Sequence, residues 1–489
     1  MPDQSLQHSS INYNRKRLCK FAGQPTNKQQ VLYNLLKPFI RFCLKAFFRN
    51  IVVLGKENLY LDGPAIFVSN HPNAFLDPLI LATAYKKQFH YIAGAEWFGK
   101  GLKNYIFRHE FNMIPVVRPW LKSGEKVSND EMFDQCYKAL AEGKKIVIYP
   151  EGTSVTVSKI RELKTGSIRI KVGGDRYLNK TASSWKEVKI IPVGVNYYNP
   201  RSFQSDVILN IGAHIDYSHI EESDEKEQVR LMTEHTREKM SELVFHFEEE
   251  GLGDLAKEIY RIYGMQLKGR YHIEDKNMAG KFQLQKDILN AVLYFQKNKP
   301  SLVDQFQQKA KELMTKLREN RLDIRFLGDY RWPWFLLLRL LFGLPFFISG
   351  WMLNIIPYKL TRWVFERFLR PKFATTYEAG KLNPSFLASM AFLLGMILFI
   401  LWYVVLSIGL IIETGHFYWI PVLIVGGYLL GVYAAQYAKT AYDFYHMILV
   451  VNRRRKRKQA FQGIRQQWEE LKSQLDRFHR EYIVARSNS

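Results

Sequence analysis

Two long uncharged stretches constrain the fold of this 489-residue chain more than any other feature. Phe386 to Ile412 contains no charged residue, and Thr414 to Ala438 contains none apart from the titratable His416. Each stretch is longer than the ~20 residues that a helix needs to cross a hydrocarbon layer of ~30 Å. A buried hairpin in a water-soluble protein is the alternative, but the sequence favours a transmembrane helical hairpin with a short link at Glu413.

Basic residues flank this hairpin on both sides. Arg370, Lys372 and Lys381 precede the first stretch, and Lys439 and the basic run 453–458 follow the second. Because basic residues favour the cytoplasmic side of a membrane, we expect both ends of the hairpin to face the cytoplasm and the link to lie outside.

A third apolar stretch, Trp332 to Tyr358, is more ambiguous. Arg339 interrupts it, and Gly343 and Pro345 are expected to break its middle. Basic residues lie at both ends, which favours a re-entrant or interfacial segment over a crossing.

A basic stripe runs along the segment from Val31 to Gly55, where Lys37, Arg41, Lys45 and Arg49 recur every four residues among apolar ones. This pattern predicts an amphipathic helix on the cytoplasmic membrane surface, where anionic lipids attract basic side chains. An ordinary surface helix with a solvated charged face is the alternative.

Short β-rich runs alternate with helical segments between residues 56 and 215. The predicted strands are Ala65–Val68, His90–Ala93, Met113–Val117, Ile146–Tyr149, Val188–Val195 and Val207–Ile211. One helix is marked by a capping-box pair, Ser128 and Glu131, and by Gly143 at its end. This alternation predicts an α/β domain with a mixed sheet flanked by helices.

The remaining segments complete the predicted organisation. A heptad seam of apolar residues in the tail favours packing against the protein's own body or a homodimer. Its members are Phe461, Ile464, Trp468, Leu471, Leu475, Phe478 and Tyr482. The predicted parts are a polar tail (1–30), an amphipathic helix (31–55), the α/β domain (56–215), a helical soluble region (216–330), a re-entrant or interfacial segment (331–385), the transmembrane hairpin (386–438) and a basic helical tail (439–489).

Charge and cysteine content narrow the function classes. The 70 Lys and Arg residues against 46 Asp and Glu give a net charge of +24, which favours anionic partners. The run 453–458 directly follows a membrane stretch, so we expect it to contact anionic lipid rather than nucleic acid. Three widely spaced cysteines offer neither a disulfide framework nor a metal site.

The segment Ser69-Asn70-His71-Pro72 places a histidine after a predicted strand, six residues before Asp77. Histidine can act as a base near neutral pH, and a carboxylate can orient its ring. On a regular helix the two residues would lie about 240° apart, so their contact requires a turn with His71 outside the helix. Taken alone, a structural histidine is the simpler interpretation.

Three further segments combine strand ends with polar or unusual residues. Arg118 ends a predicted strand and suits phosphate, although a lone arginine is usually a solvated charge. A Pro-Glu-Gly-Thr turn follows another strand and precedes Lys164, but an ordinary turn would look the same. Pro192 indicates an irregular or edge strand.

In this order and spacing, the four segments resemble the glycerolipid acyltransferase family over about residues 50–215. The resemblance implies that His71 is the general base, Asp77 its orienting partner and Arg118 a phosphate clamp. It also implies that Glu151, Gly152 and Thr153 lie in the acceptor site, and that Pro192 lies near the acyl-donor groove.

Two features depart from the usual family pattern. Five residues rather than four separate His71 from Asp77, and Ser154 stands where many members have arginine. The first departure resembles the fungal-type glycerol-3-phosphate/dihydroxyacetone-phosphate branch. The second leaves Lys164 as the residue expected to share phosphate binding with Arg118.

The resemblance implies a multi-pass membrane enzyme of phospholipid biosynthesis, with its catalytic domain facing the cytoplasm. It would move a fatty acyl group from a coenzyme A or carrier-protein thioester to a glycerol phosphate, of which glycerol-3-phosphate is the favoured acceptor. The reaction would need neither a metal nor another cofactor. A lysophosphatidic acid acyltransferase and a non-catalytic lipid-binding scaffold are the alternatives. A lipase is disfavoured because the sequence has no Gly-x-Ser-x-Gly elbow. A transporter is disfavoured because the two long uncharged stretches of this chain carry almost no ionisable residues.

Overall fold

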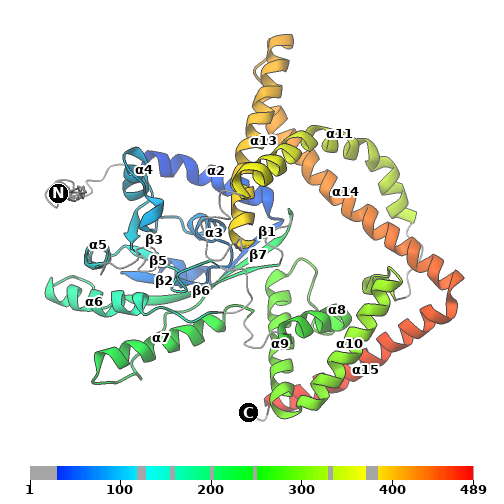
Figure 1. Ribbon diagram of the computed structural model, residues 1–489, viewed down its shortest axis with the longest axis horizontal. Helices are drawn as coiled ribbons and strands as arrows, with labels where there is room; N and C mark the ends of the chain where they lie inside the picture. Colours follow the sequence, from blue (N-terminus) through cyan, green and yellow to red (C-terminus); the bar gives the residue numbers. More distant parts are fainter. Residues whose placement is uncertain are drawn as a thin grey trace, which may run out of the picture.

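The computed structural model describes residues 30–117, 128–154, 160–198, 203–245, 251–328, 334–370 and 384–487. Figure 1 shows a central sheet with helices on both faces, a separate group of helices, and long helices that connect the two. The predicted fold class, a mixed sheet flanked by helices followed by long apolar helices, is confirmed.

The sheet has seven strands in the order β1-β7-β6-β2-β5-β3-β4. Its strands are β1 (Asn50–Leu54), β2 (Ala65–Ser69), β3 (His90–Gly94), β4 (Met113–Val116), β5 (Lys145–Ile148), β6 (Lys189–Tyr197) and β7 (Asp206–Ile211). All neighbours are parallel except β6 and β7. The carboxyl ends of β2, β3, β4, β5 and β6 therefore share one edge, and the six predicted strands are all present.

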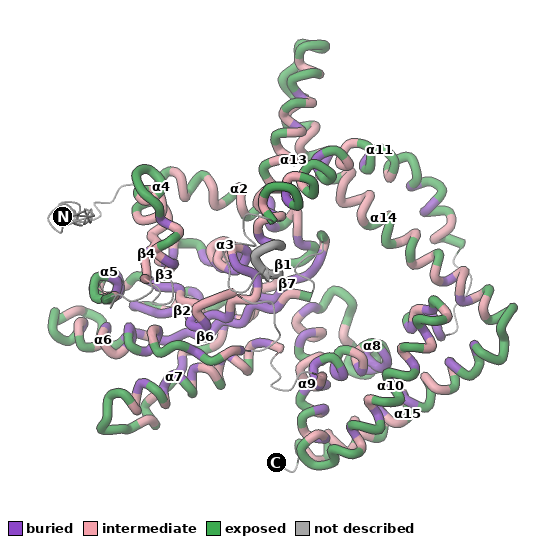
Figure 2. The backbone as a smooth tube through the Cα atoms, viewed as in Figure 1, coloured by how far each residue is buried: buried purple, intermediate pink, exposed green. Residues whose placement is uncertain are grey.

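Helices cover both faces of this sheet. They are α2 (Val31–Phe47), α3 (Leu76–Ala84), α5 (Asp130–Ala141), α6 (Gly166–Lys180) and α7 (Glu225–Ser241). The short α4 (Leu102–Tyr105) lies between β3 and β4 in the sequence and has no buried residue. Phe67 points to the core formed with α2 and α3, whereas Ile66 and Val68 point to the core formed with α5, α6 and α7. The buried residues concentrate along the sheet (Figure 2), as expected for strands covered on both sides.

Strand β1 was not predicted. The expected helix over 31–55 ends at Phe47, and β1 pairs in parallel with β7. The β-branched run Ile51-Val52-Val53 favours a strand, and pairing with β7 satisfies its backbone groups.

The basic stripe of α2 is partly used inside the protein. Lys37 Nζ donates to the carbonyl oxygens of Lys86 and Lys87, and Arg49 pairs with Asp206. Only part of the predicted basic stripe is therefore available to contact anionic lipid. The outer face of α2 also exposes apolar side chains, among them Val31, Leu35 and Phe42.

Helix α5 is confirmed, but its predicted capping box is absent. The Ser128 hydroxyl accepts from the Asp130 N–H, and Glu131 accepts from Gln135 within the helix. The N-cap residue is Asn129, whose side chain is bonded to the backbone of the segment after β4.

A second unit consists of α8 (Leu252–Arg270), α9 (Met278–Asn298), α10 (Pro300–Glu319) and α15 (Lys458–Ser487). The apolar seam of α15, including Phe461, Leu471 and Leu475, is buried against the other three helices. Of the two interpretations of this seam, packing against the protein's own body is therefore the one observed. The predicted helical region 216–330 divides between the two units, because α7 packs on the sheet.

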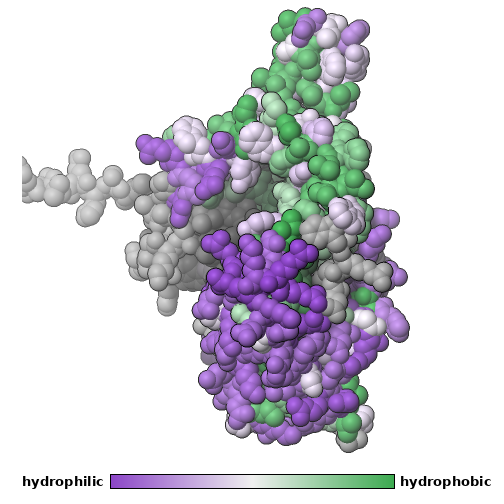
Figure 3. Space-filling model, turned by 90° about the vertical axis from the view of Figure 1, so that its right-hand side faces the viewer, coloured by the Kyte–Doolittle hydropathy of each residue, from purple (hydrophilic) through white to green (hydrophobic). Residues whose placement is uncertain are grey.

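Three described helices are long and apolar enough to cross a membrane: α11 (Trp334–Val364) with its extension to Leu369, α13 (Pro384–Thr414) and α14 (Trp419–Lys456). Their hydrophobic surface forms the upper part of the face shown in Figure 3, above a hydrophilic lower part. The predicted break in α11 is wrong, because the helix is continuous through Gly343 and Pro345. Gly343 instead permits close approach of Tyr433 and Tyr437 in α14.

The first half of α11 runs along α14 toward the link of the hairpin. The Tyr437 hydroxyl donates to the carbonyl oxygen of Leu340 at 2.9 Å. At the centre of α11, Asn354 accepts from the Tyr403 hydroxyl of α13 and donates to the Gly427 carbonyl of α14. All three apolar helices therefore meet at Asn354.

The second half of α11 returns along α13 and away from the link. Thr361 lies close to Gly395, which precedes Tyr403 in α13 by more than two turns. Both ends of α11 therefore face the same end of the hairpin, the end nearest the sheet and the helical unit (Figure 1). Pro345 and Pro357 lie within α11, and proline commonly bends a helix.

Candidate active site

His71 lies in the turn that follows β2, at the edge where five parallel strands end. Its Nδ1 is 2.8 Å from Asp77 Oδ2, and Asp77 lies in the first turn of α3. The side chain of His71 is 19% exposed and that of Asp77 is fully buried. The turn thus brings the two side chains together with His71 outside the helix, as the spacing of the sequence requires.

Asp77 is held by two further donors. Its Oδ2 also accepts from the Asn73 N–H at 2.8 Å, and its Oδ1 accepts from the Tyr197 hydroxyl at 2.7 Å. Tyr197 is the last residue of β6, which continues beyond the end of neighbouring β2. Hydrogen bonds to a carboxylate fix its orientation, so the position of His71 is set by a well-restrained partner.

The ring of Tyr149 stacks on the ring of His71, with centroids 4.1 Å apart and planes 20° apart. Tyr149 directly follows β5, the strand beside β2. Its hydroxyl is buried without a hydrogen-bond partner among the described residues, and burial raises its pKa well above the ordinary value. Tyr149 therefore forms one wall for the imidazole and remains neutral.

The Pro-Glu-Gly-Thr turn after β5 is held by Arg161. The guanidinium donates to Glu151 Oε2 and to Thr153 Oγ1, both at 2.7 Å, and also to the Thr153 carbonyl oxygen. A guanidinium thus reaches this turn from a position that the sequence pattern did not indicate. Its donors are engaged by the turn itself, so Arg161 serves to shape it.

Glu151 is buried next to this guanidinium. Burial raises the pKa of its carboxyl, while the charge and hydrogen bond of Arg161 and the nearby His71 act in the opposite direction. An ion pair is the usual way to keep a buried carboxylate charged. The negative charge of the buried Glu151 side chain therefore depends on Arg161.

Gly152 and Lys164 lie against each other. Gly152 has a positive φ of 76°, and a Cβ atom placed on it would lie 2.8 Å from Lys164 Nζ. The Lys164 N–H donates to the Pro150 carbonyl oxygen at 2.9 Å. Glycine is therefore favoured here by its backbone conformation, and its lack of a side chain lets the Lys164 ammonium group approach the turn.

Ser154 also contributes to the turn around His71. Its hydroxyl accepts from the Ala74 N–H at 2.7 Å, and Ala74 has a positive φ of 36°. A serine at this position thus supports a strained backbone between His71 and Asp77.

Two further predicted site residues are Arg118 and Pro192. Arg118 lies outside the described residues, although β4, which precedes it, ends at the same edge of the sheet as β2. Pro192 lies inside β6 opposite Val68, and β6 lies between β7 and β2, so of the two predicted alternatives, an irregular strand or an edge strand, the edge strand is wrong. Its carbonyl oxygen accepts from the Gly212 N–H just beyond β7, so the ladder of hydrogen bonds between β6 and β7 ends at this position. The missing N–H of proline therefore removes no hydrogen bond from that ladder.

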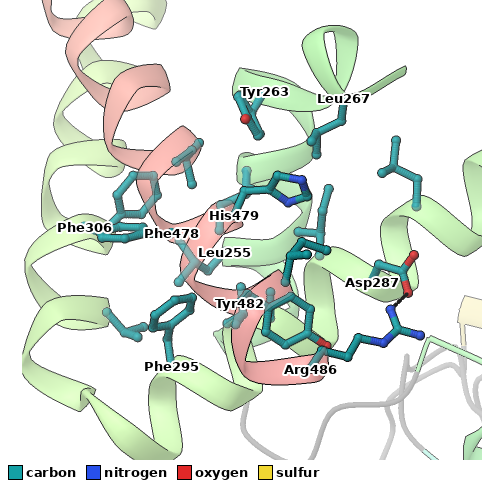
Figure 4. Close-up of a pocket in the computed structure, with 18 of the residues that line it drawn as sticks. Leu255, Tyr263, Leu267, Asp287, Phe295, Phe306, Phe478, His479, Tyr482 and Arg486 are labelled. Carbon is teal, nitrogen blue, oxygen red and sulfur yellow. Dashed lines mark ion pairs between the residues drawn. The ribbon is translucent and has the colours of Figure 1, made fainter. Parts of the chain in front are cut away.

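A cavity lies elsewhere, in the helical unit (Figure 4). It has a volume of about 240 Å³ and is bordered by apolar side chains from α8, α9, α10 and α15, with Asp287 and Arg486 paired at one side. It contains none of the predicted site residues. Among the described residues, no group of histidine, cysteine or acidic side chains could hold a metal ion.

Sequence reasoning missed three residues of the site: Tyr149, Arg161 and Tyr197. Tyr149 could have been found, because it ends a strand that meets the edge carrying His71. Tyr197 and Arg161 carry no comparable signal, since their contacts depend on how distant segments fold together.

Residues 50–196 match the model of the family described as Acyltransferase, a segment that runs from β1 almost to the end of β6 and contains His71, Asp77 and Glu151. No curated protein matches the chain. Among solved structures, it is similar to the crystal structure of the 1-acyl-sn-glycerophosphate (LPA) acyltransferase PlsC from Thermotoga maritima. The identity is 20%, the TM-score is 0.30, and the match covers 45% of this chain and 84% of that one.

Proposed function

Because residues 50–196 form a domain of the acyltransferase family, we propose that this chain transfers a fatty acyl group from a thioester to a hydroxyl of a glycerol phosphate, with glycerol-3-phosphate as the first candidate. The observation that carries the proposal is the contact between His71 and Asp77 at a partly exposed sheet edge.

In this proposal, one atom of His71 takes part in the proton transfer. Nδ1 is engaged by Asp77, which leaves Nε2 to accept the proton of the acceptor hydroxyl as its oxygen attacks the thioester carbonyl. The thiolate then leaves and takes the proton from the imidazolium. The new ester bond replaces the thioester bond, so atoms and charge balance without a metal or other cofactor. A positioned base contributes roughly 10²–10⁴ in rate.

Binding of the acceptor falls to the neighbouring turn. Lys164 supplies a point charge for phosphate beside Gly152, and Arg118 is proposed as its partner. Glu151, Gly152 and Thr153 line the acceptor site in a shape maintained by Arg161. Pro192 is proposed to lie near the groove for the acyl donor, a coenzyme A or carrier-protein thioester.

Helices α13 and α14 are proposed to cross the membrane, with both ends in the cytoplasm and the acyltransferase domain on that side. Basic residues at both ends of the pair support this orientation. Since both ends of α11 face the same end of the hairpin, α11 is proposed to be re-entrant. The exposed apolar surface of α13 begins at Ile397, six residues or about 9 Å before Tyr403, so the centre of α11 would lie within the half of the hydrocarbon layer nearest the acyltransferase domain.

This arrangement suits a reaction with one apolar and one anionic substrate. Membrane lipid is the proposed partner of the exposed faces of α2, α11, α13 and α14, and nucleic acid is not. A net charge of +24 attracts both the phosphorylated acceptor and the thioester donor. No dimer through α15 is proposed, because its apolar seam is buried within the chain.

The test is an acceptor panel with the purified full-length chain in lipid nanodiscs. Glycerol-3-phosphate, dihydroxyacetone phosphate and lysophosphatidic acid would each be incubated with radiolabelled palmitoyl-CoA, and the products identified by mass spectrometry. The proposal expects a monoacylated product from glycerol-3-phosphate. Product from lysophosphatidic acid alone would reassign the acceptor, and no product from any acceptor would indicate a lipid-binding scaffold.

A further inference from the structure

The first turns of α13 are built into the core of the acyltransferase domain. Phe392 is buried and packs edge-to-face against Phe47 of α2, with ring centroids 5.2 Å apart. Leu393 and Met396 pack against the same core. Farther along, Ile397, Leu401 and other apolar residues are exposed, as expected for a face toward lipid. Helix α13 therefore changes from domain core to apolar surface within about two turns (Figure 2).

Ser389 lies at this junction and is bonded to the turn that carries His71. Its hydroxyl lies 2.6 Å from the Asn73 carbonyl oxygen and 3.0 Å from Asn73 Oδ1, and donates to both. Its oxygen also accepts from the Leu76 N–H, at 3.4 Å. Ser389 and Asn73 are both fully buried, so water cannot replace these bonds without a change in packing.

Asn73 connects Ser389 to the catalytic pair. The Asn73 N–H donates to Asp77 Oδ2, the same oxygen that contacts His71 Nδ1. The next residue, Ala74, has a positive φ, and strained backbone of this kind persists only where its surroundings fix it. Ser389 supplies part of that restraint, although it lies more than 300 positions away in the sequence.

We infer that Ser389 is a positioning residue, through which the membrane hairpin holds the His71–Asp77 turn in its reactive geometry. The inference rests on the proposed acyl transfer and extends it: the first apolar helix of the hairpin is part of the active-site structure as well as an anchor. The base then lies where α13 leaves the domain for the membrane, next to the surface at which a lipid product must depart.

Ser407 provides a matched control in the same helix. It is also fully buried, and its hydroxyl donates to the carbonyl oxygens of Tyr403 and Trp419. These bonds remain within α13 and α14 and do not reach the acyltransferase domain. Ser407→Ala therefore removes a buried hydroxyl from the hairpin without affecting the His71 turn.

The experiment compares Ser389→Ala, Ser389→Thr and Ser407→Ala in the full-length chain in nanodiscs. Hydrogen exchange of the peptide covering residues 70–81 is measured together with kcat and the KM for glycerol-3-phosphate. For Ser389→Ala we expect faster exchange in this peptide and a kcat about tenfold lower with KM within twofold, because small misplacements of a catalytic group are costly. Ser389→Thr keeps the hydroxyl and should recover part of the kcat.

Ser407→Ala should match the original chain in both measurements. Exchange and kcat in Ser389→Ala equal to those of the original chain would overturn the inference, as would faster exchange with unchanged kcat. A chain that transfers no acyl group would refute the proposed function. In that case the exchange comparison still decides whether Ser389 holds the turn.

Discussion

The Tyr197 hydroxyl donates a 2.7 Å hydrogen bond to Asp77 Oδ1, while the other carboxylate oxygen of Asp77 contacts His71. Tyr197 ends β6 and Asp77 lies in the first turn of α3, so the bond joins the sheet to the helix that carries the partner of His71. Burial, together with the adjacent Asp77 charge, raises the pKa of Tyr197 well above its ordinary value, which keeps the hydroxyl protonated as a donor.

Tyr197→Phe removes this bond and leaves the aromatic ring. Asp77 keeps its bonds to Asn73 and His71 but loses one restraint, so we expect kcat to fall by about three- to tenfold with little change in KM. Steady-state kinetics with varied acceptor would measure both. Tyr198→Phe, at the exposed neighbouring position, is the control, and an unchanged kcat in Tyr197→Phe would show that the bond does not position Asp77.

Arg161→Ala leaves Glu151 buried without its ion pair. We expect a loss of about 2 kcal/mol in the free energy of unfolding, seen as a decrease of about 5 °C in the thermal midpoint at neutral pH. Arg161 lowers the pKa of Glu151, so its removal raises that pKa further. A carboxyl group whose pKa is raised by folding lowers the stability at pH values above that pKa and not at pH values below it. The difference in stability between Arg161→Ala and the original chain should therefore shrink as the pH falls.

The double variant Glu151→Gln/Arg161→Ala separates charge from packing. It has no buried charge, so it should unfold at a higher temperature than Arg161→Ala. A double variant less stable than Arg161→Ala would contradict the role assigned to this ion pair.

Lys164→Ala and Arg118→Ala both test phosphate binding. Each removes a cation proposed to contact the acceptor, so we expect the KM for the phosphorylated acceptor to rise about tenfold, with a smaller effect on kcat. Lys180→Ala, at the exposed end of α6, is the control for net charge. A KM that changes equally in all three variants would indicate long-range attraction instead of direct binding.

His90 predicts a specific pH dependence of stability. Burial, and to a lesser degree the charge of Lys144, lowers the pKa of His90 to about 4 from 6.5. A depressed pKa means that the unfolded chain binds the proton first, so stability is complete above pH 6.5 and is lost as the pH falls toward 4. The thermal midpoint of His90→Gln should fall less over this interval, and equal slopes would contradict the assignment.

The His71 turn and the sheet were predictable because their signals are local. Strand runs alternate with helical ones, and the spacing of His71 and Asp77 already required a turn. Strand β1 was missed because its short β-branched run, Ile51-Val52-Val53, follows an amphipathic helix with no glycine or proline between them to mark the end of the helix.

Contacts between distant segments could not be predicted in this way. Tyr197 and Ser389 reach the His71 turn from 120 and more than 300 residues away, and neither belongs to a recognisable pattern. The continuity of α11 was not predicted for a similar reason. Gly343 and Pro345 would break an isolated helix, but close packing of Gly343 against α14 and tolerance of proline in apolar helices allow it to continue.

The most direct measurement of the central claim is acyl transfer by His71→Ala in nanodiscs, with His272→Ala, an exposed histidine outside the site, as the control. The account predicts that His71→Ala lowers transfer by at least about 100-fold while the chain still integrates into membranes, and that His272→Ala is unaffected. Transfer by His71→Ala at the rate of the original chain would contradict the assignment of His71 as the base.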